Sequence, residues 1–226
     1  MLFILPVGDD NPRKRTPVVN YLLLAANLAV FAYLFLLHGS EYGSIVSKYG
    51  LVPRLMLDDP AGQAWKLVTA MFLHGGTTHL IGNMLFLWIA GDNVEDRLGH
   101  GSYLFFYLFS GVVANLGHVM MTSGPSALVP CIGASGAIAG VLGAYMVWFP
   151  RRRIRFWYFF FFLMGFFSIP SAYAIGFWFL EQLYLKSLAD RSIYIGVAYW
   201  AHIGGFVAGA LLALALRLAE AVRSRV

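Results

Sequence analysis

The stretch Cys131-Ile132-Gly133-Ala134-Ser135-Gly136-Ala137-Ile138-Ala139-Gly140 places a serine between glycines at the start of an apolar run. Gly133 and Gly136 let the backbone bend and let another segment come close to the serine. A helix that begins here directs unpaired N–H groups toward its surroundings, and such groups stabilise an oxyanion. The stretch therefore predicts that Ser135 is a nucleophile. The alternative is a packing face, because glycine and serine also line close contacts between membrane helices.

Composition indicates an integral membrane protein with one domain. Apolar residues make up 59% of the 226 residues, charged residues make up 12%, and the mean hydropathy is +0.69. These values lie far from those of soluble proteins. The net charge of +5 does not indicate nucleic-acid binding, because the basic residues fall in short clusters between apolar runs. Cys131 is the only cysteine, so no intramolecular disulfide is possible.

Six apolar segments are expected to cross the membrane as helices, since about 20 apolar residues at ~1.5 Å per residue span the hydrocarbon core. The expected spans are residues 18–37, 78–91, 102–121, 134–149, 168–185 and 197–216. Prolines at 125 and 130 separate the third span from the fourth, so Ser135 is expected at a helix start. The pattern predicts an all-α, polytopic membrane protein. Its membrane domain covers residues 18–217, between an N-terminal segment, 1–17, and a tail, 218–226.

Three segments between the spans are assigned from their composition. Residues 39–75 are of mixed composition, and their apolar residues, Trp65, Met71, Phe72 and Leu73, are too interrupted to span, so we expect an interfacial, partly buried loop. The charged residues within 92–97 are expected to form a polar turn after the second span. The aromatic run 156–167 is expected to lie at the interface or to begin the fifth span, in which Pro170 suits the first helical turn.

The basic residues predict the orientation of the chain. Six spans put both termini on one side, and 11 of the 16 Lys and Arg residues fall in segments on that side. These are Arg13, Lys14, Arg15, Arg97, Arg151, Arg152, Arg153, Arg155, Arg217, Arg223 and Arg225. By the positive-inside rule the termini are cytoplasmic. The loop before Ser135 and the start of the sixth span then both lie on the outer side, so Ser135 and His202 share a depth.

His202 is the candidate general base. A serine hydroxyl is a poor nucleophile unless a neighbouring group takes its proton, and imidazole titrates near neutral pH. An ionisable group within a span is costly, which makes it a functional hypothesis by default. Small residues at 198, 205 and 209 share its helix face, and glycines at 136, 140 and 143 recur at similar spacing in the fourth span. Two such faces can approach closely and bring Ser135 to His202. The alternative is a histidine that bonds across two helices.

His79 and Asn83 lie four residues apart on one face of the second span. An imidazole N–H and an asparagine amide are donors suited to an oxyanion, together with the backbone N–H of Ser135. Hydrogen bonding between helices is the alternative. Asparagine is a poor zinc ligand and no third His or Cys is well placed, so we expect no metal and no cofactor.

No acid is placed to complete a catalytic triad. Glu181 and Asp190 lie near the outer ends of the last two spans, but neither has a spacing that ties it to His202. A Ser/His dyad is therefore the economical interpretation.

Three motifs resemble those of the rhomboid intramembrane serine proteases, in the same order and on the corresponding spans. They are Gly133-Ala134-Ser135-Gly136, Ala201-His202-Ile203-Gly204 and the pair His79 and Asn83. Trp65-Lys66 is similar to that family's Trp-Arg element, with Lys in place of Arg, and Gly91-Asp92-Asn93-Val94-Glu95 resembles its usual exit from the second span. One position departs from the pattern. Many members carry a tyrosine four residues after the serine, stacked on the histidine, where this chain has Ala139.

The resemblance implies a six-helix rhomboid bundle with a water-filled cavity open to the outer side. Ser135 would be the nucleophile, His202 the base, and His79, Asn83 and the Ser135 N–H the oxyanion donors, with Gly133 and Gly136 in support. The expected partners are single-span membrane proteins, cut near the outer end of their span, and the lipid bilayer, but no nucleic acid. The expected location is the bacterial inner membrane. The sequence does not specify an oligomeric state.

A substrate that leaves the lipid sideways needs a wall that opens. The fifth span has bulky aromatics, Trp178 and Phe179, and no glycine-lined partner face, so it is the predicted gate. One rival function is a proteolytically inactive rhomboid relative that binds transmembrane segments, against which the intact Ser135 and His202 argue. The other rival is a small transporter, which should show an internal repeat that we do not find.

Overall fold

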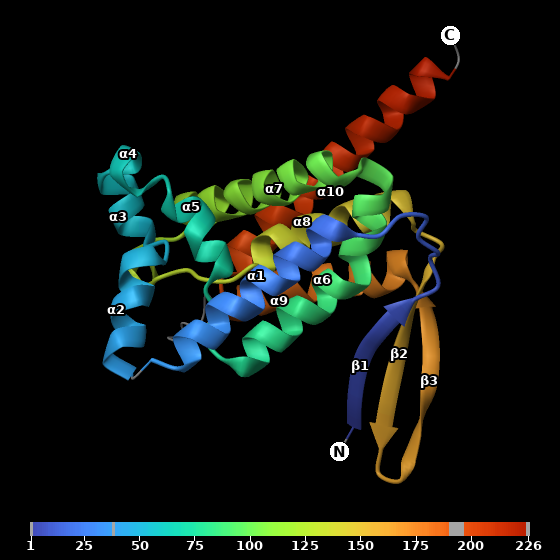
Figure 1. Cartoon of the computed structure of the whole chain (residues 1–226), viewed down its shortest axis with the longest axis horizontal. Coiled ribbons are helices and arrows are strands. Elements are labelled where there is room, and N and C mark those ends of the chain that lie inside the picture. The colour runs from blue at the N-terminus through green and yellow to red at the C-terminus, as the bar shows by residue number, and fades with distance from the viewer. Residues whose placement is uncertain (1, 38, 190–196, 225–226) are drawn as a thin grey trace.

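The computed structural model describes residues 2–37, 39–189 and 197–224. Asp190, named above as a candidate acid, and the last two residues of the tail lie outside this range. Six helices form the bundle shown in Figure 1. They are α1 (Val18–Phe35), α6 (Thr77–Leu98), α7 (His100–Met121), α8 (Ser135–Trp148), α9 (Ser171–Ala189) and α10 (Tyr199–Arg223). By length and composition α1, α7 and α10 are able to cross a membrane, whereas the crossing by all six stays a prediction.

Helix α8 is the central helix of the bundle. All of its residues from 136 to 145 are buried, and it packs against α6, α7, α9 and α10. Small residues make this position possible, because they let neighbouring backbones approach from several sides. The helix is short and apolar, at 14 residues. The central location puts its first residue, Ser135, inside the bundle instead of on its lipid-facing surface.

Glycines bring α8 and α10 into backbone contact. A Cβ atom added at Gly205 would lie 2.0 Å from the carbonyl oxygen of Gly136, and one added at Gly209 would lie 2.1 Å from that of Gly140. Real side chains do not tolerate such distances, so both positions need glycine for close approach. The two helices run in the same direction from neighbouring starts. The contact therefore fixes the start of α10 beside the start of α8.

The expected polar turn at 92–97 is wrong, because α6 continues as a helix to Leu98. Glu95 in its last turns is 1% exposed and accepts hydrogen bonds from the backbone N–H groups of Val19 and Asn20, at 2.9 and 2.7 Å. These N–H groups belong to the first turn of α1 and have no partner within that helix. The carboxylate can therefore be buried, because backbone N–H groups at the start of α1 donate hydrogen bonds to it. Gly99, at φ 79°, ends α6.

Short helices replace the expected irregular loop between the first two long helices. They are α2 (Gly39–Tyr49), α3 (Pro53–Asp58), α4 (Pro60–Gln63), α5 (Lys66–Thr69) and the 3-10 turn η1 (Ala70–Phe72). A second 3-10 turn, η2 (Gly124–Leu128), follows α7. The Nδ2 group of Asn115 donates to the carbonyl of Leu67 at 2.8 Å and so ties α5 to α7. These segments gather at one end of the bundle (Figure 1).

A three-stranded antiparallel sheet lies at the opposite end, so the all-α expectation is wrong in this respect. The strands β1 (Leu2–Asp9), β2 (Arg153–Phe160) and β3 (Leu163–Pro170) pair in the order β1-β2-β3. The aromatic run 156–167 forms part of this hairpin and does not begin the fifth helix. Aromatic and β-branched residues favour extended backbone, and Phe161, at φ 53°, lies in the turn. Helix α9 begins at Ser171, directly after Pro170.

Candidate active site

Ser135 and His202 meet where α8 and α10 begin. The Oγ atom of Ser135 lies 2.7 Å from Nε2 of His202, a hydrogen-bond distance between residues 67 positions apart. Ser135 is the first residue of α8, and His202 lies in the first turn of α10. Both side chains are partly buried. The glycine contact between the two helices continues directly below this pair, so packing and the side-chain contact depend on the same faces.

Gln182 of α9 holds the other side of the His202 ring. Its Oε1 atom lies 2.8 Å from Nδ1 of His202. An amide oxygen accepts but does not donate, so Nδ1 carries the ring proton and Nε2 has a free lone pair. The Nε2 atom is therefore the acceptor for the hydroxyl proton of Ser135. Gln182 could not be predicted from the sequence, because no spacing connects it with His202. The neighbouring acid, Glu181, is exposed.

Aromatic side chains complete the surroundings of His202. The ring centroid of Trp178 lies 6.0 Å from that of His202, and the ring of Tyr199 lies edge-on at 6.4 Å. Ala139 is fully buried in α8 and offers no ring. In place of the tyrosine that many rhomboids carry at position 139, Trp178 of α9 supplies an aromatic contact to His202. Trp178, predicted above as part of a gate, lies at the site itself.

His79 lies beside the glycine that precedes the serine. A Cβ atom added at Gly133 would lie 2.9 Å from both Cε1 and Nε2 of the His79 ring, and 3.6 Å from Oγ of Ser135. Gly133 also has φ 128°, which other residues rarely adopt. The structure thus brings His79, Gly133 and Ser135 together. The amide of the buried Asn83 donates to the carbonyl of His79 at 2.9 Å, within its own helix.

A further histidine, His74, adjoins the site and was not singled out from the sequence. It is fully buried in the loop before α6, and its ring lies edge-on to that of His79 at 5.1 Å. Burial, with a smaller contribution from His79, lowers the pKa of His74 to about 4. The ring is therefore neutral at pH 7, and it packs behind His79 without adding charge. The described residues contain no group of three or more His, Cys, Asp or Glu side chains arranged to hold a metal.

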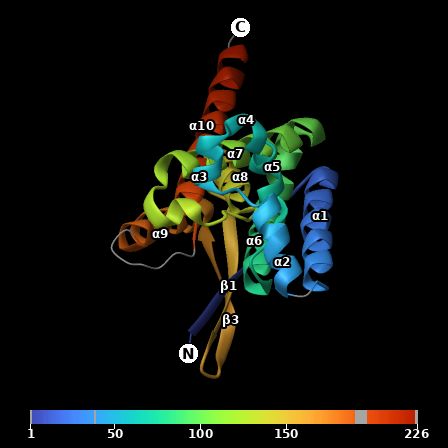
Figure 2. The same ribbon diagram turned by 90° about the vertical axis from the view of Figure 1, so that its left-hand side faces the viewer.

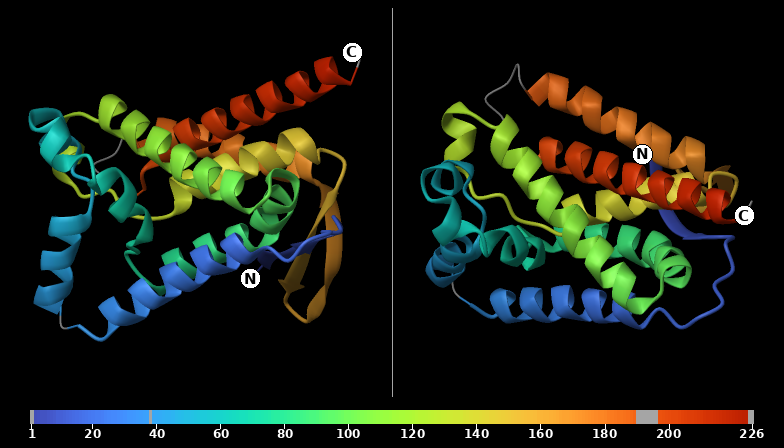
Figure 3. Two further views of the ribbon diagram at one scale, coloured as in Figure 1. Left: turned by 45° about the horizontal axis from the view of Figure 1, so that its top comes forward. Right: turned by 90° about the horizontal axis from the view of Figure 1, so that it is seen from above.

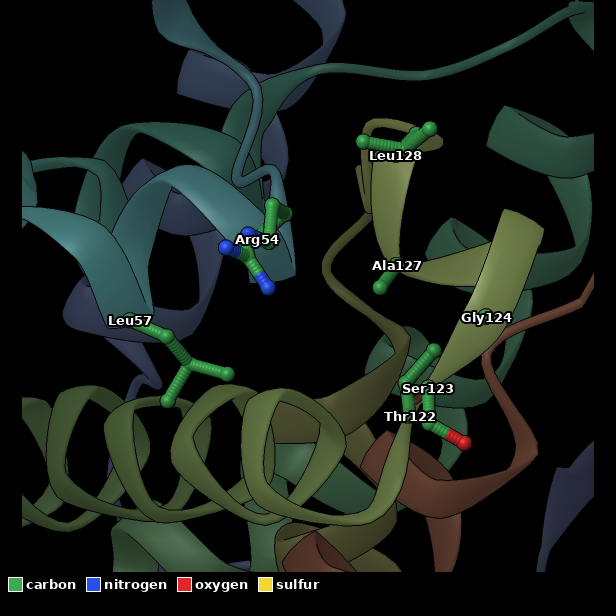
Figure 4. Close-up of a pocket in the computed structure, with 7 residues that line it drawn as sticks. All are labelled: Arg54, Leu57, Thr122, Ser123, Gly124, Ala127 and Leu128. Carbon is green, nitrogen blue, oxygen red and sulfur yellow. The ribbon is translucent and has the colours of Figure 1, made fainter.

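A hollow of about 390 Å³ lies away from Ser135, between α3 and η2. Figure 4 shows Arg54 and Leu57 on one side of it, facing Thr122, Ser123, Ala127 and Leu128. Arg54 is paired with Asp58 at 3.0 Å. The lining contains neither Ser135 nor His202, so this hollow is separate from the candidate active site.

Comparison with known proteins finds relatives whose names identify them as rhomboids. The chain is 34% identical over 130 residues to the rhomboid protease GluP of Bacillus subtilis, which covers 58% of this chain and 24% of that protein. It is 29% identical over 193 residues to the mitochondrial rhomboid protein 1 of Saccharomyces cerevisiae, covering 84% and 51%, and 30% identical over 155 residues to the rhomboid-like protein 4 of Arabidopsis thaliana, covering 68% and 34%. The chain thus spans about half or less of the length of these relatives.

The model of the Rhomboid domain matches residues 61–219. That range holds most of the chain and includes Ser135, His202, His79 and Gln182. This protein is a member of the rhomboid family of membrane proteins.

Proposed function

We propose that this protein is an intramembrane serine endopeptidase that uses Ser135 and His202 as a dyad. The observation that carries the proposal is the 2.7 Å contact between Oγ and Nε2 in a family member whose relatives include a named protease. A serine becomes an effective nucleophile when a base accepts its proton, and Nε2 is the unprotonated nitrogen of His202.

The reaction follows from the positions of these atoms. The Ser135 Oγ attacks the peptide carbonyl carbon while its proton passes to Nε2 of His202, and a tetrahedral oxyanion forms. His202 returns the proton to the leaving amine, the C–N bond breaks, and an acyl ester remains on Ser135. Water, deprotonated by the same Nε2, then hydrolyses the ester, which releases the carboxylic acid and regenerates the serine. The other ring proton stays on Nδ1 of His202 throughout, where it is donated to Oε1 of Gln182.

The oxyanion donors are assigned to the same end of α8. The first backbone N–H groups of α8, that of Ser135 included, have no carbonyl within the helix to bind. The ring of His79 lies against Gly133, within reach of the carbonyl position beside Ser135. The amide of Asn83 has a second N–H besides the one that donates to His79. Several donors aimed at one oxygen stabilise the charge that develops in the transition state.

The proposed substrate is the single transmembrane segment of another membrane protein, cut near its outer end. Peptide bonds within an intact helix are inaccessible, so the segment has to present extended backbone to Ser135. The excess of basic residues in the segments on the same side as the termini supports an orientation with both termini in the cytoplasm, in a bacterial inner membrane. In this orientation residues 18–217 form the membrane domain, and 1–17 and 218–226 lie on the cytoplasmic side.

The dyad predicts that Ser135→Ala and His202→Ala each lower cleavage of a single-span substrate by about 10³-fold or more, and that the double variant is no worse than either, since the two residues act as one unit. Cleavage is measured by gel assay with purified protein in detergent. Thermal unfolding of each variant serves as the folding control. Cleavage by Ser135→Ala at the wild-type rate would refute the dyad, and a wild-type protein that binds the segment without cutting it would favour the inactive-relative alternative.

Gln182 is proposed as the positioning residue that keeps His202 in its reactive tautomer. Without an acceptor at Nδ1, the ring can carry its proton on Nε2 and cannot take one from Ser135. We expect Gln182→Leu to lower kcat by about 10²-fold with KM nearly unchanged, and Gln182→Glu, which keeps an acceptor oxygen, to retain most activity. Glu181→Gln is the matched control, one residue away and exposed. Equal kcat for Gln182→Leu and Glu181→Gln would contradict this role.

Helix α9 is proposed as the gate for the substrate. It lies at the margin of the bundle beside α10 (Figure 3), and the ring of Phe179 stacks on Phe206 of α10 at 4.2 Å. Trp178 contacts Phe86 of α6 at 6.3 Å and His202 at 6.0 Å. These aromatic contacts fill space and can separate at the cost of dispersion energy alone. Because Trp178 also touches His202, Phe179 is the cleaner position for a test.

Phe179→Ala should raise the rate of cleavage of single-span substrates, because it removes a contact that closes α9 onto α10. Labelling by a small soluble fluorophosphonate, which needs no lateral entry, should not rise. Phe177→Ala is the control. It is the same substitution on the same helix, at a side chain that is 72% exposed. The gate would be abandoned if Phe179→Ala, with unchanged thermal stability, cut substrate no faster than Phe177→Ala.

A further inference from the structure

The sheet β1-β2-β3 extends sideways from the end of the helix bundle. Its strands run across the direction of the bundle helices, and the hairpin tip and the first residues of β1 lie farthest from them (Figures 1 and 2). A sheet that crosses the helix direction at a bundle end runs along the membrane plane, if the helices cross the membrane. It therefore lies near the level of one leaflet's surface, at the end where α8 finishes and α9 begins.

One face of the sheet is turned toward the bundle. At the root of β2, Ile154 is buried and belongs to the main hydrophobic core, and its partner across the sheet is Asp9 of β1. Asp9 is hydrogen-bonded by Tyr145 of α8 and by the side-chain amide of Asn93 of α6. Since side chains alternate along a strand, every second residue outward from Ile154 shares this face. We call it the bundle-side face.

The bundle-side face stays apolar beyond the point where the helices end beneath it. From Ile154 toward the hairpin tip, the β2 residues on this face are Phe156, Tyr158 and Phe160. On β1, Ile4 pairs with Tyr158 and Leu2 pairs with Phe160. Leu2, Ile4 and Phe160 are exposed, as is Leu163 opposite Phe160 on β3. At the hairpin tip Phe162 is 97% exposed. This extent of exposed apolar surface in water would be costly, so an apolar environment is needed.

Basic residues surround the root of the sheet. Arg151, Arg152, Arg153 and Arg155 are all exposed, and Arg13, Lys14 and Arg15 follow β1. Four acids lie among them: Asp9, Asp10, which accepts the backbone N–H of Arg153, Asp92, which pairs with Arg13 at 3.1 Å, and Asp96, which accepts the backbone N–H of Lys14. Arg153 and Arg155 project from the face opposite Ile154, and Arg155 lies over the ring of Phe166 at 4.3 Å. The net positive charge is complementary to anionic lipid phosphates.

The unpaired edges of the sheet limit how deep in the membrane it can lie. β1 and β3 are edge strands, and their outward N–H and C=O groups have no strand partner. Such groups are not tolerated in the hydrocarbon core, where no water is present to bind them. The headgroup region supplies water and phosphate, and it is also where aromatic residues concentrate in membrane proteins.

We propose that the sheet is a lipid-binding extension of the bundle that lies in the headgroup region of the leaflet at this end. Its bundle-side face contacts the upper acyl chains, and the arginines at its root bind anionic phosphates. It steadies the bundle next to α9, whose first residue, Ser171, donates from its backbone N–H to the carbonyl of Arg152 at 2.7 Å. This inference concerns the sheet and does not depend on proteolysis.

The test uses single cysteines in a Cys131→Ser background, labelled with an environment-sensitive fluorophore and reconstituted into phosphatidylcholine vesicles with added phosphatidylglycerol. Phe160→Cys and Phe162→Cys report on the sheet. Leu28→Cys on exposed α1 surface is the lipid reference, and Ser224→Cys beyond the end of α10 is the aqueous reference. Quenching by iodide in water is compared with quenching by lipids that carry a nitroxide near the acyl carbonyl.

Lipid quenching at 160 and 162 should equal or exceed that at Leu28, which lies midway along α1 and so deeper than the nitroxide. Iodide quenching at both positions should be well below that at Ser224, and omission of phosphatidylglycerol should reduce the lipid quenching at the sheet alone. Iodide access equal to that at Ser224 would overturn the proposal. Protection from both quenchers, with disulfide-linked dimers of Phe162→Cys that persist on dilution into excess lipid, would assign the surface to a second copy of the chain and also overturn it. Insensitivity to phosphatidylglycerol would overturn the role of the arginines.

Discussion

The backbone contact between α8 and α10 is the constraint on which the rest of the structure depends. Carbonyl oxygens of Gly136 and Gly140 occupy the space where side chains at 205 and 209 would stand. A side chain larger than glycine at either position would force the helices apart, and the contact sets the starts of both helices side by side. The 2.7 Å distance between Ser135 and His202 is a consequence of this packing. A polar pair is thus held within an apolar bundle by residues that carry no functional group.

Helix α9 connects the orientation of His202 with access to the site. Gln182 holds Nδ1 of His202, and Trp178, one helical turn earlier, lies beside the same ring. If α9 swings outward to admit a substrate, both contacts are released together. His202 would then regain its reactive tautomer only after α9 returns over the bound segment. On the proposed function, this coupling keeps the base inactive while the site is open to lipid and water.

Much of the site was accessible from the sequence because it depends on short-range patterns. The spacing of small residues around 136–143 and 198–209 predicts two faces that can touch, and the prolines before Ser135 predict a helix start. Gln182 was not accessible, since its contact depends on the rotation of α9 about its axis, which no local pattern determines. Glu95 was assigned to a turn because charges usually end a span. It lies within α6 because the N–H groups at the start of α1, 75 residues earlier, satisfy it.

The sheet could not be predicted for a similar reason. A run such as Phe156-Trp157-Tyr158-Phe159-Phe160 is apolar on both faces, so its hydropathy does not distinguish a strand from the start of a membrane helix. One of its two pairing partners is the N-terminal strand, more than 140 residues away, and long-range pairing leaves no local signature. Helices α1, α7 and α10, by contrast, follow from runs of apolar residues whose lengths match a bilayer.

The central claim is that packing of α8 on α10 makes Ser135 a nucleophile activated by His202. The most direct test is labelling of the protein in membranes with a fluorophosphonate, followed by mass spectrometric mapping of the adduct. The account predicts one adduct, on Ser135, that is absent from His202→Ala and undiminished in Gly176→Ala, a glycine of α9 with open space around it. An adduct on another residue, or labelling of Ser135 at the wild-type rate in His202→Ala, would contradict it.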